Sequence, residues 1–157
     1  MKTSAQKITA RLIAVLMILA VFVSGLSMTS MAANTADTEF EFSLNLLGYT
    51  RNSEVRKKTN TTPVYFYWTG TTGTSTTVNV RVLGGTATSN ATTNYTYASG
   101  ASVDHVVCTR GVKYSISSLA YESGRPYVRF SLRTGGIATL SGVWSPDSSR
   151  VYTRATA

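Results

Sequence analysis

The sequence of 157 residues is poor in the residue types from which most catalytic and metal-binding sites are built. It contains a single cysteine, Cys108, and a single histidine, His105. A lone cysteine excludes a disulfide within the chain and a zinc site made of several cysteines. A lone histidine excludes a metal site made of several histidines and leaves few ways of pairing a nucleophile with a base. These shortages favour a non-enzymatic protein without a cofactor or a metal ion.

Acidic residues are also scarce, with seven Asp and Glu against fifteen Lys and Arg. A calcium-binding loop needs several acids close together, and the sequence has no such group. Glu39 and Glu41 share one face of a predicted strand at about 7 Å, a separation found in glycosidase carboxylate pairs. An exposed strand face offers no cleft for a substrate, however. An enzyme acting on glycans is therefore only a minor hypothesis.

His105 has two sequence neighbours that could complete a catalytic pair, Asp104 and Cys108. In a regular strand, neighbouring residues point to opposite faces, and so do residues three apart. The sequence therefore predicts that neither side chain pairs with His105. We expect Cys108 to be a buried, unreactive thiol, with a bridge between two chains as the alternative.

Only one long apolar run occurs, at residues 12–26, and it is shorter than the ~20 residues that a membrane-spanning helix needs. It follows a segment with three basic residues and no acid, and it precedes the small residues Ser30 and Ala32. This order predicts a signal peptide over residues 1–32, cleaved after Ala32. A retained membrane anchor is the alternative. We expect a secreted, extracellular protein that does not span the membrane after cleavage.

The chain stays basic without its first 32 residues, since 12 basic and 7 acidic residues remain, for a formal net charge of +5. Excess positive charge on an exported protein points to anionic partners such as cell-wall polymers. Export argues against nucleic acid as the partner. The remaining length suits one domain. We expect a flexible tail at residues 33–38 and a single domain at residues 39–157.

No segment after residue 32 shows a helical period. Short stretches instead alternate apolar and polar residues, which is typical of half-buried strands. The clearest alternation covers residues 39–46, 64–68, 76–83, 126–132 and 137–144, and weaker candidates cover 95–97, 103–108, 112–117 and 150–154. About seven or eight short strands with turns between them predict an all-β fold. We expect an antiparallel β-sandwich, with a β-barrel as the alternative.

Two glycine-containing loops join consecutive predicted strands. Residues 70–75 separate the strand at 64–69 from the strand at 76–83, and residues 134–136 separate the last two clear strands. Short glycine-rich loops between strands are typical of hairpins, so the sequence predicts two hairpins. The polar and basic residues 48–62 predict a long connection.

Three short stretches carry a resemblance to known proteins. They are Arg56, Lys57 and Lys58 before a predicted strand, residues 121–124 (Tyr-Glu-Ser-Gly), and residues 141–148 (Ser-Gly-Val-Trp-Ser-Pro-Asp-Ser). Together with the signal segment, they resemble a group of small exported proteins of Gram-positive bacteria, generally of unknown function. The resemblance implies a secreted β-rich protein and supplies no catalytic residues. The lactococcin-like bacteriocins share the plan of a signal peptide followed by a compact β-domain.

The candidate binding residues are basic and aromatic. The densest basic group lies between Arg51 and Lys58, two tyrosines follow it closely, and Arg129 shares a strand face with Tyr127. Basic side chains attract anionic polymers and lipid headgroups, and tyrosines can stack on sugars. Ordinary surface charge and tyrosines covered by a second layer are the alternatives. The predicted surface-binding residues are Arg56, Lys57, Lys58, Tyr65, Tyr67 and Arg129.

These observations predict a secreted, non-enzymatic β-sandwich protein that binds the cell envelope or another extracellular surface. The partner would be an anionic cell-wall polymer or a glycan. A secreted bacteriocin-like toxin that acts on other cells is the main alternative. An enzyme acting on the wall and a self-associating matrix subunit are two further hypotheses, and the sequence leaves the oligomeric state open.

Overall fold

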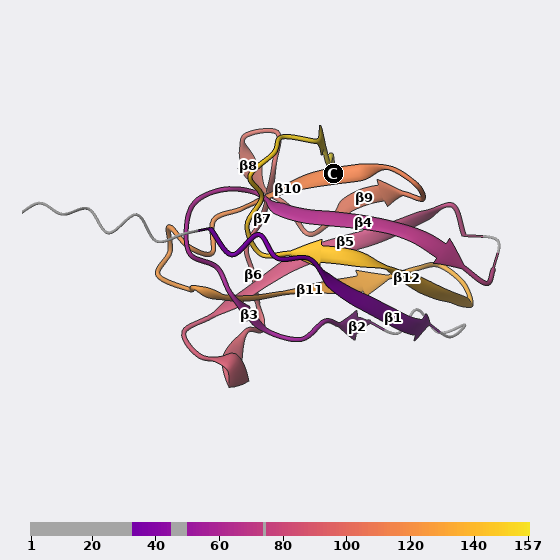
Figure 1. The fold of residues 1–157 in the computed structure, drawn as a ribbon, viewed down its shortest axis with the longest axis horizontal. Helices are drawn as coiled ribbons and strands as arrows, with labels where there is room; N and C mark the ends of the chain where they lie inside the picture. The colour runs from indigo at the N-terminus through magenta and orange to yellow at the C-terminus, as the bar shows by residue number, and fades with distance from the viewer. Residues whose placement is uncertain (1–32, 45–49, 74) are drawn as a thin grey trace, which may run out of the picture. The chain divides into compact units, whose positions relative to one another are not determined.

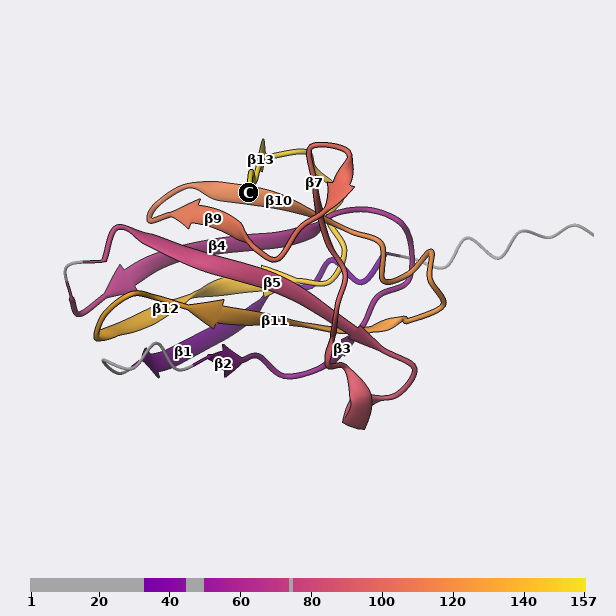
Figure 2. The same ribbon diagram turned by 180° about the vertical axis from the view of Figure 1, so that it is seen from behind.

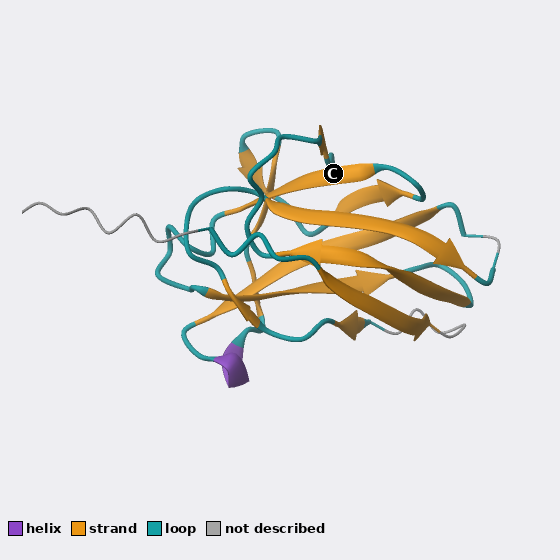
Figure 3. Cartoon of the chain, viewed as in Figure 1, coloured by secondary structure: helices purple, strands orange, loops and turns teal. Residues whose placement is uncertain are grey.

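The computed structural model describes residues 33–44, 50–73 and 75–157 (Figure 1). The predicted signal peptide, residues 1–32, lies outside the described residues. Within these ranges the chain forms thirteen strands and one short 3₁₀ helix, Thr88–Asn90 (Figure 3). Seven of these strands have four or more residues and correspond to the alternating stretches of the sequence. No described helix is long and apolar enough to cross a membrane.

The strands form two sheets that pack face to face. In the seven-stranded sheet the order is β1 (Thr38–Leu44), β12 (Ala138–Ser145), β4 (Val64–Thr71), β10 (Lys113–Ser118), β7 (Thr96–Ala98) and β8 (Ala101–Ser102), and β13 (Thr153–Arg154) also pairs with β10. In the six-stranded sheet the order is β2 (Arg51–Asn52), β11 (Tyr127–Arg133), β5 (Thr77–Gly85) and β6 (Thr93–Asn94), with β3 (Arg56–Lys57) beside β11 and β9 (Val106–Thr109) beside β5. All pairs are antiparallel except that of β10 with β13. Neither sheet closes into a barrel, which confirms the predicted β-sandwich.

The space between the sheets is filled by the apolar side chains that alternate along each strand. Phe130 of β11 lies at the centre of an aromatic cluster, with its ring centroid 4.9 Å from that of Phe40, 5.3 Å from Phe66 and 5.2 Å from Trp144. Burial of each such side chain contributes about 1.5–3 kcal/mol to folding. The cluster joins strands of both sheets, so it holds the two layers together.

The two predicted hairpins are wrong. β4 lies in the seven-stranded sheet and β5 in the six-stranded sheet, and β11 and β12 are divided in the same way (Figure 2). β4 pairs with β12 and β5 pairs with β11, so both glycine-containing loops cross between the layers. A backbone hydrogen bond of 3.2 Å from Thr72 N to Thr139 O links the neighbouring ends of these crossings. Two strands that face each other across a core show the same alternation of apolar and polar residues as two strands of a hairpin. The sequence pattern therefore does not distinguish a hairpin from a loop that crosses between the sheets.

Residues 33–38, which the sequence predicts to be a flexible tail, are held against the sandwich. The Asn34 backbone N–H donates to Asp147 Oδ2 at 3.0 Å, and its side-chain Nδ2 donates to the Lys57 carbonyl at 2.8 Å. Asn34 Oδ1 accepts a hydrogen bond of 2.8 Å from Arg56. β1 then begins at Thr38. The partners of Asn34 are distant in the sequence, so its own neighbourhood gives no sign of this anchoring.

The basic connection predicted at residues 48–62 contains two short strands where the structure describes it. In β2, Asn52 pairs with Ser131, and in β3, Lys57 pairs with Tyr127. Both strands lie along the outer edge of β11. Arg51, Arg56 and Lys57 are therefore part of the six-stranded sheet.

Candidate functional site

The six residues predicted to form one binding surface lie in separate environments. Lys58 and Tyr65 are buried, Arg56 and Tyr67 are half-buried, and only Lys57 and Arg129 are on the outer face of the six-stranded sheet. The tyrosines belong to β4 in the other sheet. The structure does not bring these residues together as one patch.

Lys58 is fully buried, which corrects its assignment to the surface. Its Nζ donates to Asp147 Oδ1 at 2.9 Å, to the Pro146 carbonyl at 2.8 Å and to the Thr62 carbonyl. Asp147 is equally buried, and its Oδ2 accepts hydrogen bonds from Thr59 N (2.9 Å) and Thr59 Oγ1 (2.8 Å). Two of the stretches that carry the family resemblance therefore meet at this ion pair.

Burial acts differently on the two charges of this pair. Burial lowers the pKa of the Lys58 ammonium, and the neighbouring Asp147 only partly opposes the shift. Burial alone would raise the pKa of Asp147, but hydrogen bonds from Thr59 and Lys58 outweigh it and keep that pKa below its usual range. The desolvation of the Lys58 ammonium is therefore offset less completely by its partners than the desolvation of the Asp147 carboxylate.

Tyr65 is also withdrawn from the surface, because the C-terminal segment covers it. Its ring packs against Tyr152 with centroids 4.9 Å apart, and burial raises its pKa to about 12. Tyr67 stays half-buried, and Lys113 Nζ lies 5.5 Å from its ring centroid and 5.9 Å from that of Tyr152. Tyr65 is therefore not open for stacking on a sugar, and it belongs to the predicted alternative of tyrosines under a second layer.

Arg56 has a structural role that the sequence does not predict. It pairs with Val128, whose side chain lies in the core, and its guanidinium sits 5.6 Å from the ring centroid of Trp144. It also donates to the Ala36 carbonyl at 2.7 Å. These contacts hold the segment before β1 and leave Arg56 little freedom to bind a ligand.

The outer side of the six-stranded sheet carries a group of cations that we call the basic face: Lys57, Arg81, Arg129 and Arg133. On β11 the side chains of Val128, Phe130 and Leu132 point into the core, so the residues between them point outward. Arg81 of β5 lies directly opposite Ser131, which places Arg129 and Arg133 on its two diagonals, about 7–8 Å away. Among the described residues, no hydrogen bond or ion pair occupies the guanidinium of Arg129 or Arg133, and Arg129 Nε is buried without a partner.

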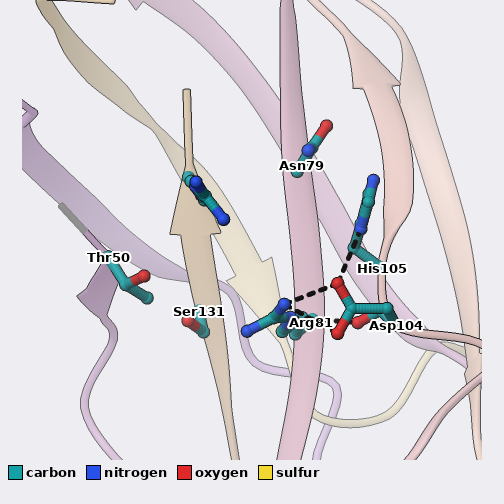
Figure 4. A pocket seen from close by; sticks show the side chains of 7 residues that line it. Thr50, Asn79, Arg81, Asp104, His105 and Ser131 are labelled. Atoms are coloured by element: carbon teal, nitrogen blue, oxygen red, sulfur yellow. Dashed lines mark hydrogen bonds and ion pairs between the residues drawn. The ribbon is translucent and has the colours of Figure 1, made fainter. Parts of the chain in front are cut away.

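A small pocket opens on the basic face around Arg81 (Figure 4). Its lining residues are Thr50, Asn79, Arg81, Asp104, His105, Ser131 and Arg133. Its volume is about 40 Å³, room for a few waters at ~10–15 Å³ each. A single charged group fits this space, whereas a whole sugar ring does not.

Asp104 organises one wall of the pocket. It accepts two hydrogen bonds from Arg81, at 2.7 and 2.5 Å, and lies 3.1 Å from His105 Nδ1 (Figure 4). The hydrogen bonds from Arg81 and then from His105 lower the pKa of Asp104. Asp104 is therefore a carboxylate that fixes the direction of the Arg81 guanidinium.

The contact between Asp104 and His105 corrects an expectation from the sequence. Opposite orientations are expected of strand residues, but β9 begins only at Val106. Both residues therefore precede the strand, and Asp104 lies in a bend. Cys108, inside β9, is buried, and burial raises the pKa of its thiol. Within the described ranges, no three His, Cys, Asp and Glu side chains lie close enough to hold a metal ion. The arrangement around Arg81 suits binding of an anion by guanidinium donors.

Comparison with known proteins gives one match. A family model described as a protein of unknown function (DUF2712) matches residues 28–148. No curated protein and no solved structure matches the chain.

Proposed function

Because the chain belongs to the DUF2712 family, whose function is unknown, its role has to be inferred from its own surface, and we propose that it is a secreted, non-enzymatic protein that binds an anionic polymer of the cell envelope. The binding surface in this proposal is the basic face of the six-stranded sheet. Its extracellular location follows from the predicted signal peptide.

The observation that carries the proposal is the pair of unoccupied guanidinium groups on β11. Arg129 and Arg133 have no acidic partner among the described residues, although seven acids are present in the sequence. Surface arginines that only keep a protein soluble need no such grouping. Three guanidinium groups around Ser131 instead concentrate positive charge on one face, which attracts polyanions.

The geometry of the face favours a linear polymer over a small ligand. Arg129 and Arg133 are four residues apart on one strand, so their Cα atoms are about 13 Å apart. Arg81 lies between them on the neighbouring strand, beside the pocket of about 40 Å³. A polymer that crosses the sheet can place one phosphate or carboxylate group in the pocket and others on the flanking arginines. Lys57 and Tyr127 extend the face toward β3.

The test is co-sedimentation of residues 33–157 with washed Gram-positive cell walls at low and high salt. Among the described residues, the hydrophobic core lies between Phe40 and Ala155, so this chain keeps that core. We expect pelleting at low salt and release at about 1 M salt, where the Debye length falls to about 3 Å. Replacing Arg129 and Arg133 together by glutamine should weaken binding about tenfold or more, equivalent to about 1.4 kcal/mol.

The matched control replaces Arg110 and Arg154 by glutamine, since both are exposed and lie off the basic face. This variant has the same net charge as the test variant and should bind like the unmodified protein. Equal weakening in both variants would show that only net charge matters, and retention at high salt would contradict a charge-dependent mechanism.

The bacteriocin-like alternative is tested with the same protein in a growth-inhibition assay. A toxin should inhibit the growth of some strains when the purified protein is added, whereas an envelope-binding protein need only be retained by the wall. Growth inhibition that is lost in the variant of Arg129 and Arg133 would place the toxin hypothesis first.

A further inference from the structure

We propose that Lys58 and Asp147 become joined by an amide bond between Nζ and Cγ, which would form a covalent cross-link inside the β-sandwich. The two groups are 2.9 Å apart and their side chains are fully buried. They are 89 residues apart in the sequence and connect the segment before β4 to the segment that follows β12. This proposal is independent of the envelope-binding function.

The surroundings of the pair already satisfy the hydrogen bonds that an amide would make. Asp147 Oδ2 would become the amide carbonyl oxygen, and it accepts hydrogen bonds from Thr59 N, Thr59 Oγ1 and Asn34 N at 2.8–3.0 Å. The single hydrogen left on Nζ would donate to the carbonyl of Pro146 or Thr62, which both accept from Nζ now. Neither polar atom of the new bond would be left without a partner.

Burial favours the condensed state. Two charges without access to water carry a large desolvation penalty, and an amide removes both charges at once. Groups held in contact also react at effective concentrations of about 10⁵–10⁸ M when they are well oriented. Burial lowers the pKa of Lys58, which favours the neutral amine that can act as a nucleophile.

The reaction needs no oxidant, reductant or other reagent. A proton passes from the Nζ ammonium to Asp147 Oδ1, which gives a neutral amine and a carboxylic acid. The Nζ lone pair then forms a bond to Cγ, and the negative charge on Oδ2 is stabilised by the N–H groups of Thr59 and Asn34. A second Nζ proton moves to Oδ1, the Cγ–Oδ1 bond breaks, and one water leaves.

The cross-link would do for this protein what a disulfide does for others. Its single cysteine cannot form a bridge within the chain. A link between residues 58 and 147 closes a long loop in the unfolded chain, and such closure stabilises the folded state. It would also fix the site at which Asn34 anchors the first described residues.

The decisive measurement is the intact mass of the denatured protein, residues 33–157, after purification in the folded state. We expect a mass lower than that of the sequence by one water. Digestion with trypsin should then give a branched peptide that joins residues 58–81 to residues 134–150, because trypsin does not cleave after an acylated lysine. The branched peptide distinguishes the cross-link from loss of water within a single peptide.

Two substitutions serve as controls. Lys57→Met removes an exposed neighbouring lysine and should keep the loss of water, whereas Lys58→Met should restore the full mass. Asp147→Asn should release ammonia instead of water if the same bond forms. If Lys58→Met fails to fold, the mass of the unmodified chain still decides the question. A full mass together with cleavage after Lys58 would overturn the proposal and leave the pair as an ion pair.

Discussion

Two pairs of oppositely charged residues hold this sandwich in different ways. Lys58 and Asp147 are both 0% exposed, whereas the Arg81 and Asp104 side chains are 34% and 66% exposed. The contact distances are similar, at 2.9 and 2.5 Å. The surroundings therefore decide what each pair does, rather than the charges or the separation.

The buried pair uses its hydrogen-bonding groups within the protein, and the exposed pair leaves part of its groups to solvent. Lys58 reaches two backbone carbonyls besides Asp147. Among the described residues, Arg81 donates side-chain hydrogen bonds only to Asp104. It lies beside the guanidinium groups of Arg129 and Arg133, for which the described residues offer no partner. A buried pair is strongly destabilised when one member is lost, whereas exposed pairs contribute little to stability. We infer a structural role for the first pair and a binding role for the second.

The largest expected effect is on stability and comes from breaking the buried pair. Asp147→Ala removes the partner of Lys58 and the acceptor of Thr59 and Asn34 together, so it should lower the free energy of unfolding by about 3–5 kcal/mol. Urea unfolding of residues 33–157 measures this loss. Asp104→Ala, the matched change in the exposed pair, should leave the unfolding midpoint unchanged. Equal shifts in the two variants would contradict the distinction between the pairs.

A smaller effect should appear when both buried charges are removed together. Lys58→Met alone leaves the charge of Asp147 buried without its cation. Adding Asp147→Asn removes that charge and keeps an acceptor for Thr59, so the double variant should be more stable than the sum of the single effects by about 1–3 kcal/mol. Urea unfolding of the two single variants and the double variant completes the cycle. Simple additivity would show that the two groups do not interact as free ions.

The sequence predicts the strands well but not their partners. Alternation along residues 126–132 and 137–144 depends on local burial, and both strands form close to the predicted bounds, at Tyr127–Arg133 and Ala138–Ser145. The same alternation is compatible with a hairpin and with a crossing between sheets. Register and pairing depend on the core as a whole, as the partnership of β4 with β12 shows.

The same limit explains the outcome for the candidate site. Lys58 looks like a surface residue because two basic residues precede it, and its partner Asp147 lies 89 residues away. Arg129 is correctly placed on an outer face because that inference needs only the period of its own strand. Asp104 and Arg81 are 23 residues apart, so their pairing depends on the bend before β9. Local patterns therefore identify Lys57 and Arg129. Only the fold adds Arg81 and Arg133 to the basic face and separates that face from the buried pair.

The smallest expected effect concerns the ionisation of the exposed pair. Arg81→Gln removes the hydrogen bonds that chiefly lower the pKa of Asp104, so this pKa should rise toward its usual value of about 3.9. A carboxyl whose pKa is lowered by folding stabilises the folded state above its unfolded-state pKa, and this contribution is lost as the pH falls through the folded-state pKa. Side-chain carboxyl NMR shifts of Asp104 between about pH 2 and 6 measure the change. Because Asp104 faces solvent, the loss of stability at neutral pH that accompanies this rise in pKa should be small compared with the loss in Asp147→Ala. An unchanged Asp104 titration would mean that Arg81 is free of Asp104 in solution, and the basic face would then offer three guanidinium groups without a partner instead of two.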